Sequence, residues 1–96
     1  MKAVWSQLAE SQLKRQIEYI REDSPKNADR VKYDIANLID KVEKYPEHFA
    51  QENYKYNNDG SYRYFEKHRL RVSFRVLANQ IRVVRVRHTS MKPLNF

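Results

Sequence analysis

The chain has 96 residues, 41% of them hydrophobic and 32% charged, with a net charge of +7 and no cysteine. That length supports one domain, residues 1–96, because half of it could not bury a useful core, and the lack of cysteine excludes disulfides and thiolate chemistry. The N-terminus has no apolar run behind a basic start, and no stretch approaches the roughly 20 apolar residues that span a bilayer. We therefore expect a soluble, cytoplasmic protein with no membrane partner.

The N-terminal half predicts a short strand followed by two helices. Residues 2–5 suit a strand, and Ser6 can cap the helix behind it. Apolar residues then recur three or four positions apart, as on one face of a helix: Ala9, Leu13, Ile17 and Ile20. Ser24-Pro25 begins a second helix that ends at Tyr45-Pro46, with the apolar face Ala28, Val31, Ile35, Leu38, Ile39 and Val42. The tight connection between them predicts an antiparallel α-hairpin.

The C-terminal half predicts a loop and three strands. Residues 47–61 are rich in the turn formers Asn, Asp, Gly and Ser. Beyond them the apolar residues alternate, which predicts strands at 62–67, 70–77 and 81–87. The gaps are so short that only hairpins fit, so these strands form an antiparallel meander. The predicted fold class is α+β: a short N-terminal strand and an α-hairpin packed on one face of a four-stranded, largely antiparallel sheet.

The turn before the last strand decides where its arginines point. In the middle strand, Val72 and Phe74 share the face that the helices must cover. A two-residue turn at Asn79-Gln80 would pair these residues with Arg87 and Arg85. That arrangement would drive two guanidinium groups into the core, at a cost of several kcal/mol each.

A three-residue turn, Ala78 to Gln80, avoids this cost and is the register we predict. It pairs Phe74 with Val84, Val72 with Val86, Ser73 with Arg85, and Arg71 with Arg87. The predicted consequence is a basic cluster on the sheet face away from the helices, formed by Arg71, Arg75, Arg85 and Arg87.

The basic charge is concentrated in the same part of the chain. Residues 61–96 contain nine Lys and Arg and one Glu, whereas residues 1–60 contain ten Lys and Arg and eleven Asp and Glu. Such a surface attracts phosphates or an acidic protein, although a merely solvated face has the same composition. Arginine rather than lysine favours bidentate recognition of oxygens. The candidate phosphate- or partner-binding residues are Arg63, Arg71, Arg75, Arg85 and Arg87.

Four stretches of the chain, in this order, carry a resemblance to a known family. They are Trp5-Ser6…Ala9…Leu13…Tyr19-Ile20, Ser24-Pro25…Ala28…Ile35…Ile39…Pro46, Arg71-Val72-Ser73-Phe74-Arg75-Val76, and Ile81…Val83…Arg85-Val86-Arg87-His88 to Pro93. Together they resemble the RelE/ParE toxin superfamily, particularly its ParE-like members. The resemblance implies a cytoplasmic toxin of a type II toxin–antitoxin pair, held inactive by a small acidic antitoxin and requiring no cofactor.

The superfamily implies two alternative activities. RelE-like members cut mRNA on the ribosome; here Arg71 matches an arginine of those nucleases and His88 falls near a catalytic histidine. On that interpretation Arg71, Arg85 and Arg87 hold phosphate and His88 acts as acid or base. ParE-like members instead inhibit DNA gyrase and lack the catalytic groups.

The departures from the nuclease pattern favour gyrase slightly as the target. Tyr62 and Tyr64 stand where RelE has a pair of lysines, and Met91 stands near the position of its phosphate-binding arginine. Those tyrosines can pack over the sheet or stack on bases, which leaves a small non-toxic RNA-binding module as a more remote alternative. His48 and His68 fall in a loop and a turn, and the three histidines lack metal-ligand spacing, so we expect no metal.

Overall fold

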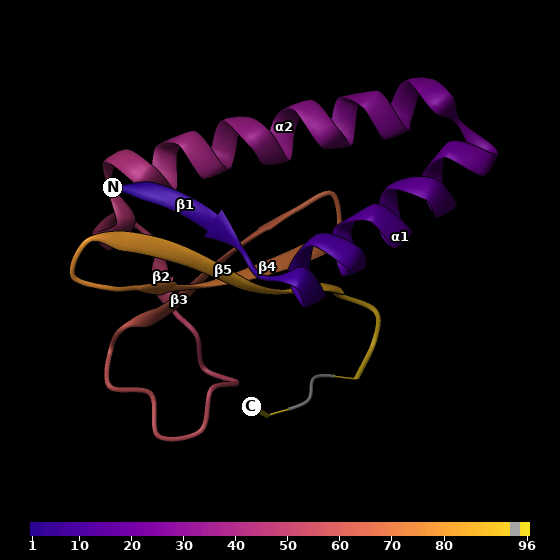
Figure 1. Ribbon diagram of the computed structural model, residues 1–96. Helices are drawn as coiled ribbons and strands as arrows, with labels where there is room; N and C mark the ends of the chain where they lie inside the picture. The colour runs from indigo at the N-terminus through magenta and orange to yellow at the C-terminus, as the bar shows by residue number, and fades with distance from the viewer. Residues whose placement is uncertain (93–94) are drawn as a thin grey trace.

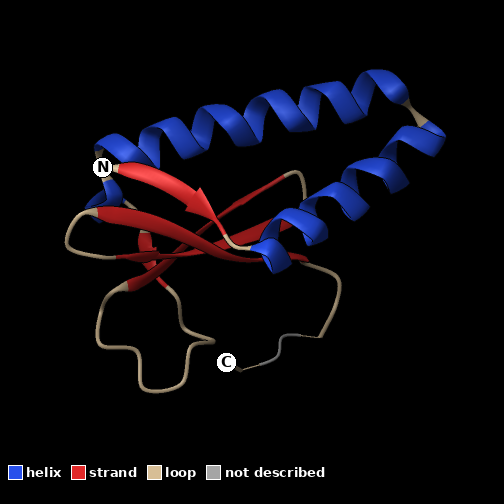
Figure 2. Cartoon of the chain, in the orientation of Figure 1, coloured by secondary structure: helices blue, strands red, loops and turns tan. Residues whose placement is uncertain are grey.

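The computed structural model describes residues 1–92 and 95–96 and has two layers (Figure 1). Two helices, α1 (Gln7–Asp23) and α2 (Pro25–Lys44), form a hairpin over one face of a sheet. The strands are β1 (Lys2–Trp5), β2 (Ala50–Gln51), β3 (Tyr62–Lys67), β4 (Leu70–Val76) and β5 (Gln80–His88), and a short 3-10 helix, η1 (Pro46–His48), precedes β2. Helices and strands segregate into the layers, as Figure 2 shows, so the predicted α+β class and α-hairpin are confirmed.

The helix boundaries follow from the predicted capping residues. The Ser6 hydroxyl accepts a hydrogen bond from the Ala9 amide at 3.0 Å, and the Ser24 hydroxyl accepts one from the Asn27 amide at 3.2 Å. Pro25 occupies the first turn of α2, where its missing N–H costs nothing. The buried core residues of the helices are Ala9, Ile17, Ala28, Val31, Ile35, Ile39 and Val42. They pack on the sheet residues Phe65, Leu70, Val72, Phe74, Ile81, Val83 and Val86.

The sheet has five strands in the order β1-β5-β4-β3-β2, so the prediction of four strands is wrong. The additional strand, β2, lies in the segment predicted as a loop and pairs antiparallel with β3, Ala50 with Tyr64 and Gln51 with Arg63. Two residues are too short to show an alternating pattern, which is why the sequence did not reveal it. β1 pairs in parallel with β5, and the three predicted meander strands are antiparallel.

In the β4–β5 hairpin most of the predicted pairs are present, but the turn that joins the strands differs from the predicted one. The pairs Val72–Val86, Ser73–Arg85 and Arg71–Arg87 are confirmed. The three-residue turn is wrong, because the Leu77 amide donates to the Gln80 carbonyl at 2.9 Å and closes a tighter turn. Phe74 consequently pairs with Val83 instead of Val84. A β-bulge at this point lets one additional residue fit between the two pairs and returns the arginines to the open face.

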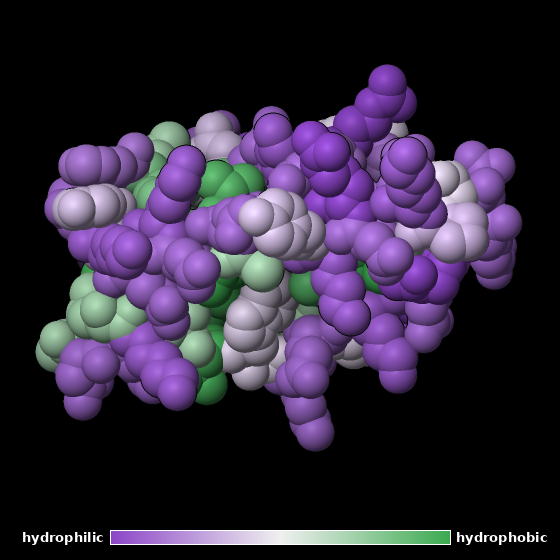
Figure 3. Space-filling view, turned by 90° about the horizontal axis from the view of Figure 1, so that it is seen from above, coloured by the Kyte–Doolittle hydropathy of each residue, from purple (hydrophilic) through white to green (hydrophobic). Residues whose placement is uncertain are grey.

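Polar side chains on the helices cover exposed backbone at the β1–β5 side of the sheet. The Ala3 amide of edge strand β1 donates to the Glu43 carboxylate at 2.6 Å, and the Val86 amide donates to the Gln12 side chain at 2.8 Å. Seen from the helix side, the surface is mainly hydrophilic, with small apolar areas between the charged groups (Figure 3). Among the described residues, no helix is long and apolar enough to cross a membrane.

Candidate binding site on the open face of the sheet

The sheet face opposite the helices carries a row of arginines from two adjacent strands. Arg71 and Arg75 lie on β4, where they alternate with the buried residues Val72 and Phe74. On β5 they are paired with arginines, Arg71 with Arg87 and Arg75 with Arg82, while Arg85 lies opposite Ser73. Like charges this close repel one another unless anions lie among them.

A carboxylate of the chain itself occupies the centre of this face. Glu52, just after β2, is only 2% exposed and accepts hydrogen bonds from two nitrogens of Arg71, Nη2 at 2.6 Å and Nε at 3.2 Å. The Ser73 hydroxyl and the Tyr54 amide also donate to it. Burial raises the pKa of Glu52, but the bonds from Arg71 and Ser73 outweigh that effect and leave the pKa below its usual value. Glu52 is therefore an ionised internal counter-ion.

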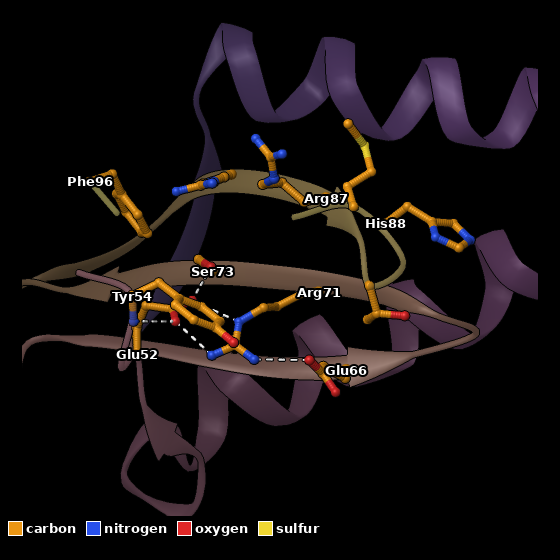
Figure 4. Close-up of a pocket in the computed structure, with 11 residues that line it drawn as sticks. Glu52, Tyr54, Glu66, Arg71, Ser73, Arg87, His88 and Phe96 are labelled. Atoms are coloured by element: carbon orange, nitrogen blue, oxygen red, sulfur yellow. Dashed lines mark hydrogen bonds and ion pairs between the residues drawn. The ribbon is translucent and has the colours of Figure 1, made fainter. Parts of the chain in front are cut away.

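Arg71 is held on every side by groups of the chain. Its Nη1 donates to Glu66 at 2.9 Å and its Nη2 also donates to the Asn53 side-chain oxygen at 2.7 Å. Its guanidinium carbon lies 3.4 Å from the centre of the Tyr64 ring and 4.6 Å from that of Tyr54. Burial lowers the pKa of Arg71, but the two carboxylates outweigh that effect and raise it overall. With four N–H donors engaged, this side chain anchors the β2–β3 loop to the sheet (Figure 4).

Beside this ion pair, a cavity of about 60 Å³ opens between the sheet and the C-terminal segment. Its lining residues are Glu52, Tyr54, Glu66, Arg71, Ser73, Arg85, Arg87, His88, Thr89, Met91 and Phe96. Phe96 lies at one end and His88 at the other (Figure 4). The Phe96 ring stacks on Arg85, with 4.4 Å between the guanidinium carbon and the ring centre. Burial, and then the charge of Arg87, lower the pKa of Arg85.

His88 lies at the rim of this cavity and its ring orientation is set locally. It pairs with Leu70, as the predicted register requires. The Ser90 amide donates to His88 Nδ1 at 3.1 Å, so in the neutral ring Nδ1 is the acceptor and Nε2 carries the proton. In that tautomer the ring can donate a hydrogen bond from Nε2, and the Nδ1 lone pair is already engaged by Ser90, so it is not free to act as a base.

The aromatic residues of β3 support the arginines. Tyr64 underlies Arg71, and the guanidinium carbon of Arg75 lies 4.9 Å from the centre of the Tyr62 ring. Phe96 meets the Tyr62 ring edge-on at 6.1 Å, and its backbone bonds to the loop through the Tyr56 amide and the Tyr54 carbonyl. Tyr62 and Tyr64 are thus cation–π platforms in this protein.

Arg63 is the one candidate arginine that lies elsewhere. It pairs with Phe74 on β4 and therefore belongs to the helix-facing side of the sheet, where its Nη1 donates to the Phe49 carbonyl at 2.6 Å. The structure does not bring it together with the other candidate arginines.

The two remaining histidines also lie away from the basic face. His68 is in the β3–β4 turn and its Nε2 meets Asp34 of α2 at 2.6 Å, which ties that turn to the helix layer. His48 stacks on Tyr45 beside η1. Among the described residues, no three His, Asp or Glu side chains gather closely enough to hold a metal ion.

The central residue that sequence reasoning missed is Glu52. It stands alone in a segment predicted as a loop, with no spacing that links it to the arginines. The only available signal was indirect: arginines clustered on one face require an anion, and an internal carboxylate satisfies this requirement as well as an external one. Pro93, where the resemblance ends, lies outside the described residues.

The chain is a small α+β protein with an arginine-rich face on its sheet, and the comparisons with known proteins place it in a family. The family described as "ParE toxin of type II toxin-antitoxin system, parDE" matches residues 3–93, so the chain belongs to the ParE toxin family. A solved structure described as "Chromosomal ParDE TA system from P. aeruginosa" has the same fold, with a TM-score of 0.69. It is 19% identical, and the match covers 92% of this chain and 95% of that one. A search among curated proteins finds no match.

Proposed function

We propose that this type II toxin arrests growth by binding DNA gyrase through the open face of its sheet, without cleaving RNA. The observation that carries the non-catalytic part is the Glu52–Arg71 ion pair. The arginine that the superfamily resemblance assigns to phosphate has four N–H donors engaged by Glu52, Asn53 and Glu66. A phosphate would have to displace a buried carboxylate, which costs the energy of breaking a buried ion pair, about 3–5 kcal/mol.

The composition of the open face supports a protein as the partner. Besides Arg85 and Arg87, the cavity is lined by Tyr54, Met91 and Phe96. Aromatic residues, methionine and arginine are the residues enriched in the buried centres of protein–protein interfaces. Glu52 and Glu66 on the same face oppose a polyanion such as RNA, which supports a protein over a nucleic acid.

The activity test compares two assays on the same purified chain. We expect it to inhibit supercoiling by gyrase and to leave ribosome-bound mRNA intact. The double variant Arg85→Gln/Arg87→Gln should lose the inhibition, because it removes the two β5 arginines that face the cavity. Full supercoiling at saturating wild-type toxin would refute gyrase as the target.

A second candidate function is a ribosome-dependent mRNA endonuclease, which one observation favours. The same cavity brings His88 together with Arg71, Arg85 and Arg87. In the neutral ring, Nε2–H of His88 can donate a hydrogen bond to a phosphate oxygen, and in the protonated ring it can supply a proton to a leaving oxygen. This candidate predicts mRNA cuts on ribosomes that disappear in His88→Ala and in Arg71→Ala, and cutting that persists in both variants would eliminate the assigned roles.

The cognate partner in the cell is proposed to be a small acidic antitoxin. Membership of the ParE toxin family supports a paired antitoxin, and the excess positive charge of residues 61–96 supports its acidic character. The proposed site of action of both partners is the cytoplasm. Where a short acidic reading frame adjoins the one that encodes this chain, its co-expression should restore growth, whereas growth arrest that persists would exclude that frame as the antitoxin.

A further inference from the structure

Charge balance around the open-face cavity specifies the kind of group that it accepts. The charged residues that line the cavity are three arginines, Arg71, Arg85 and Arg87, and two glutamates, Glu52 and Glu66. Together they carry one net positive charge. Arg71 is paired with both glutamates, and Arg85 and Arg87 line the β5 side of the same cavity. A single negative charge placed there neutralises the cavity.

The walls of the cavity restrict the shape of that group. A volume of about 60 Å³ accommodates one small anionic group with little space beyond it. Phe96 covers Arg85 from one side, and Met91, which is 53% exposed, adds an apolar wall at the mouth. A polar group flanked by apolar atoms fits these walls, as in a peptide that carries one acidic side chain between apolar neighbours.

The guanidinium groups supply the recognition chemistry. Arg87 makes a 3.4 Å contact with the Lys92 carbonyl, which is long for a hydrogen bond. Its position two residues beyond Arg85 puts both side chains on the same face of β5. Planar guanidinium forks bind a carboxylate through paired, charge-assisted hydrogen bonds, which a lysine at the same place does not reproduce.

We propose that this cavity is a binding pocket for one carboxylate of a partner protein, an Asp or Glu side chain flanked by apolar residues, held by Arg85 and Arg87. The inference deepens the proposed function, since it rests on the open face as the surface that binds a protein. Glu52 prepares the pocket: it pairs with Arg71, so that the residues lining the cavity carry one net positive charge, which one carboxylate matches.

The test uses two short peptides and needs no gyrase. The probes are the blocked tripeptides Leu-Glu-Leu and Leu-Gln-Leu, titrated into the full ¹⁵N-labelled chain while the arginine Nε–H signals are followed by NMR. We expect the Glu peptide to shift the signals of Arg85 and Arg87 and to bind at least tenfold more tightly than the Gln peptide. Equal binding of the two peptides would refute the carboxylate pocket, whatever the gyrase assay shows.

Matched variants separate a pocket from a general basic field. Arg87→Gln should weaken the Glu peptide about tenfold, the usual loss for a charge-assisted hydrogen bond. Arg82→Gln removes the same charge from the same strand, but Arg82 does not line the cavity. This variant should therefore change the affinity for the Glu peptide by no more than about twofold, as expected for a screened surface charge. Equal losses in the two variants would mean that only the overall field attracts the peptide.

Two further measurements keep the result interpretable. Arg87→Lys preserves the positive charge but removes the planar guanidinium fork, so it should also weaken binding of the Glu peptide. This variant tests the pocket even if Arg87→Gln does not fold. Inorganic phosphate and a short uridylate strand are titrated in parallel. If either bound more tightly than the Glu peptide and lost its affinity in Arg87→Gln, the pocket would be a phosphate site and the carboxylate assignment would be wrong.

Discussion

Glu52 is the buried carboxylate at the centre of the open face. A carboxylate that is 1% exposed in its side chain faces an Arg71 side chain that is 14% exposed, so neither charge is well screened by water. The pair removes Arg71 from the set of available cations and fixes the loop that carries Tyr54. Arg85 and Arg87 line the same cavity from β5, and they are the arginines that the proposed partner would contact.

At this site we predict that Glu52→Gln destabilises the fold markedly. The change leaves the buried Arg71 without its charge partner, and breaking a buried pair from one side costs about 3–5 kcal/mol. Thermal unfolding should show a fall in Tm of more than about 10 °C. Glu66→Gln is the matched control: it faces the same arginine but is 47% exposed in its side chain, so it should cost no more than about 1 kcal/mol. A similar loss in both variants would contradict the assigned role of Glu52.

The depressed pKa of Glu52 also predicts a pH dependence. A carboxyl group whose pKa is lower in the folded than in the unfolded chain stabilises the fold above its unfolded value, near 4.5, and loses that contribution as the pH falls through the folded value. The stability gap between wild type and Glu52→Gln should therefore be full above about pH 4.5 and narrow as the pH falls below that value. Urea unfolding at several pH values measures it, and the other carboxyls cancel because both proteins share them. A gap independent of pH would show that folding does not lower the pKa of Glu52.

Among the elements, the β4–β5 hairpin shows how much the sequence could predict. The alternation of Val72 and Phe74, with the cost of burying arginines, was enough to place Arg85 and Arg87 on the open face. The turn and the bulge were not predictable, because a tight turn with one bulged residue and a longer turn without a bulge satisfy the same burial pattern. Sequence periodicity thus gives the faces of a strand more securely than its individual pairs.

The segment before β3 was beyond sequence prediction for a different reason. Both helices, their caps and the meander have a period that can be recognised, whereas β2 has two residues and Glu52 follows it alone. Its role depends on contacts 19 and 21 residues away along the chain, with Arg71 and Ser73. The position of Glu52 beside Arg71 and Ser73 therefore could not be predicted, because tertiary contacts and not a local sequence pattern determine it.

At the edge of the sheet we predict that Glu43 keeps the protein from self-association. Its carboxylate accepts the Ala3 amide of edge strand β1, and an uncovered edge amide is a starting point for pairing with another chain. Glu43→Ala should therefore increase self-association, seen as a concentration-dependent rise in sedimentation coefficient. Glu18→Ala, which removes an exposed carboxylate from α1, is the control and should sediment like wild type. If the sedimentation coefficients of both variants matched wild type at all concentrations, Glu43 would not be what prevents pairing at this edge.

The whole molecule has two faces of different charge. The helix layer and its connections belong mainly to residues 1–60, where positive and negative residues nearly balance, while β3 to β5 contribute the excess. The helices cover one side of the sheet, so most of the excess is displayed on the other side (Figure 1). The proposed partners should therefore approach the toxin from the sheet side, guided by the field of that face.

This asymmetry predicts that toxicity depends on where charge is removed and not on how much. Arg85→Gln/Arg87→Gln and Lys14→Gln/Lys26→Gln each remove two positive charges, the first pair from the open face and the second from exposed positions of the two helices. In cells that express each variant from an inducible promoter, we expect the β5 variant to lose growth arrest and the helix variant to keep it. Equal soluble amounts of the two proteins, and equal unfolding temperatures to within a few degrees, make the comparison valid.

If both variants lost toxicity to the same extent, net charge would be the property that matters. If both kept it, the target would bind away from Arg85 and Arg87, and the helix layer would become the surface to mutate next.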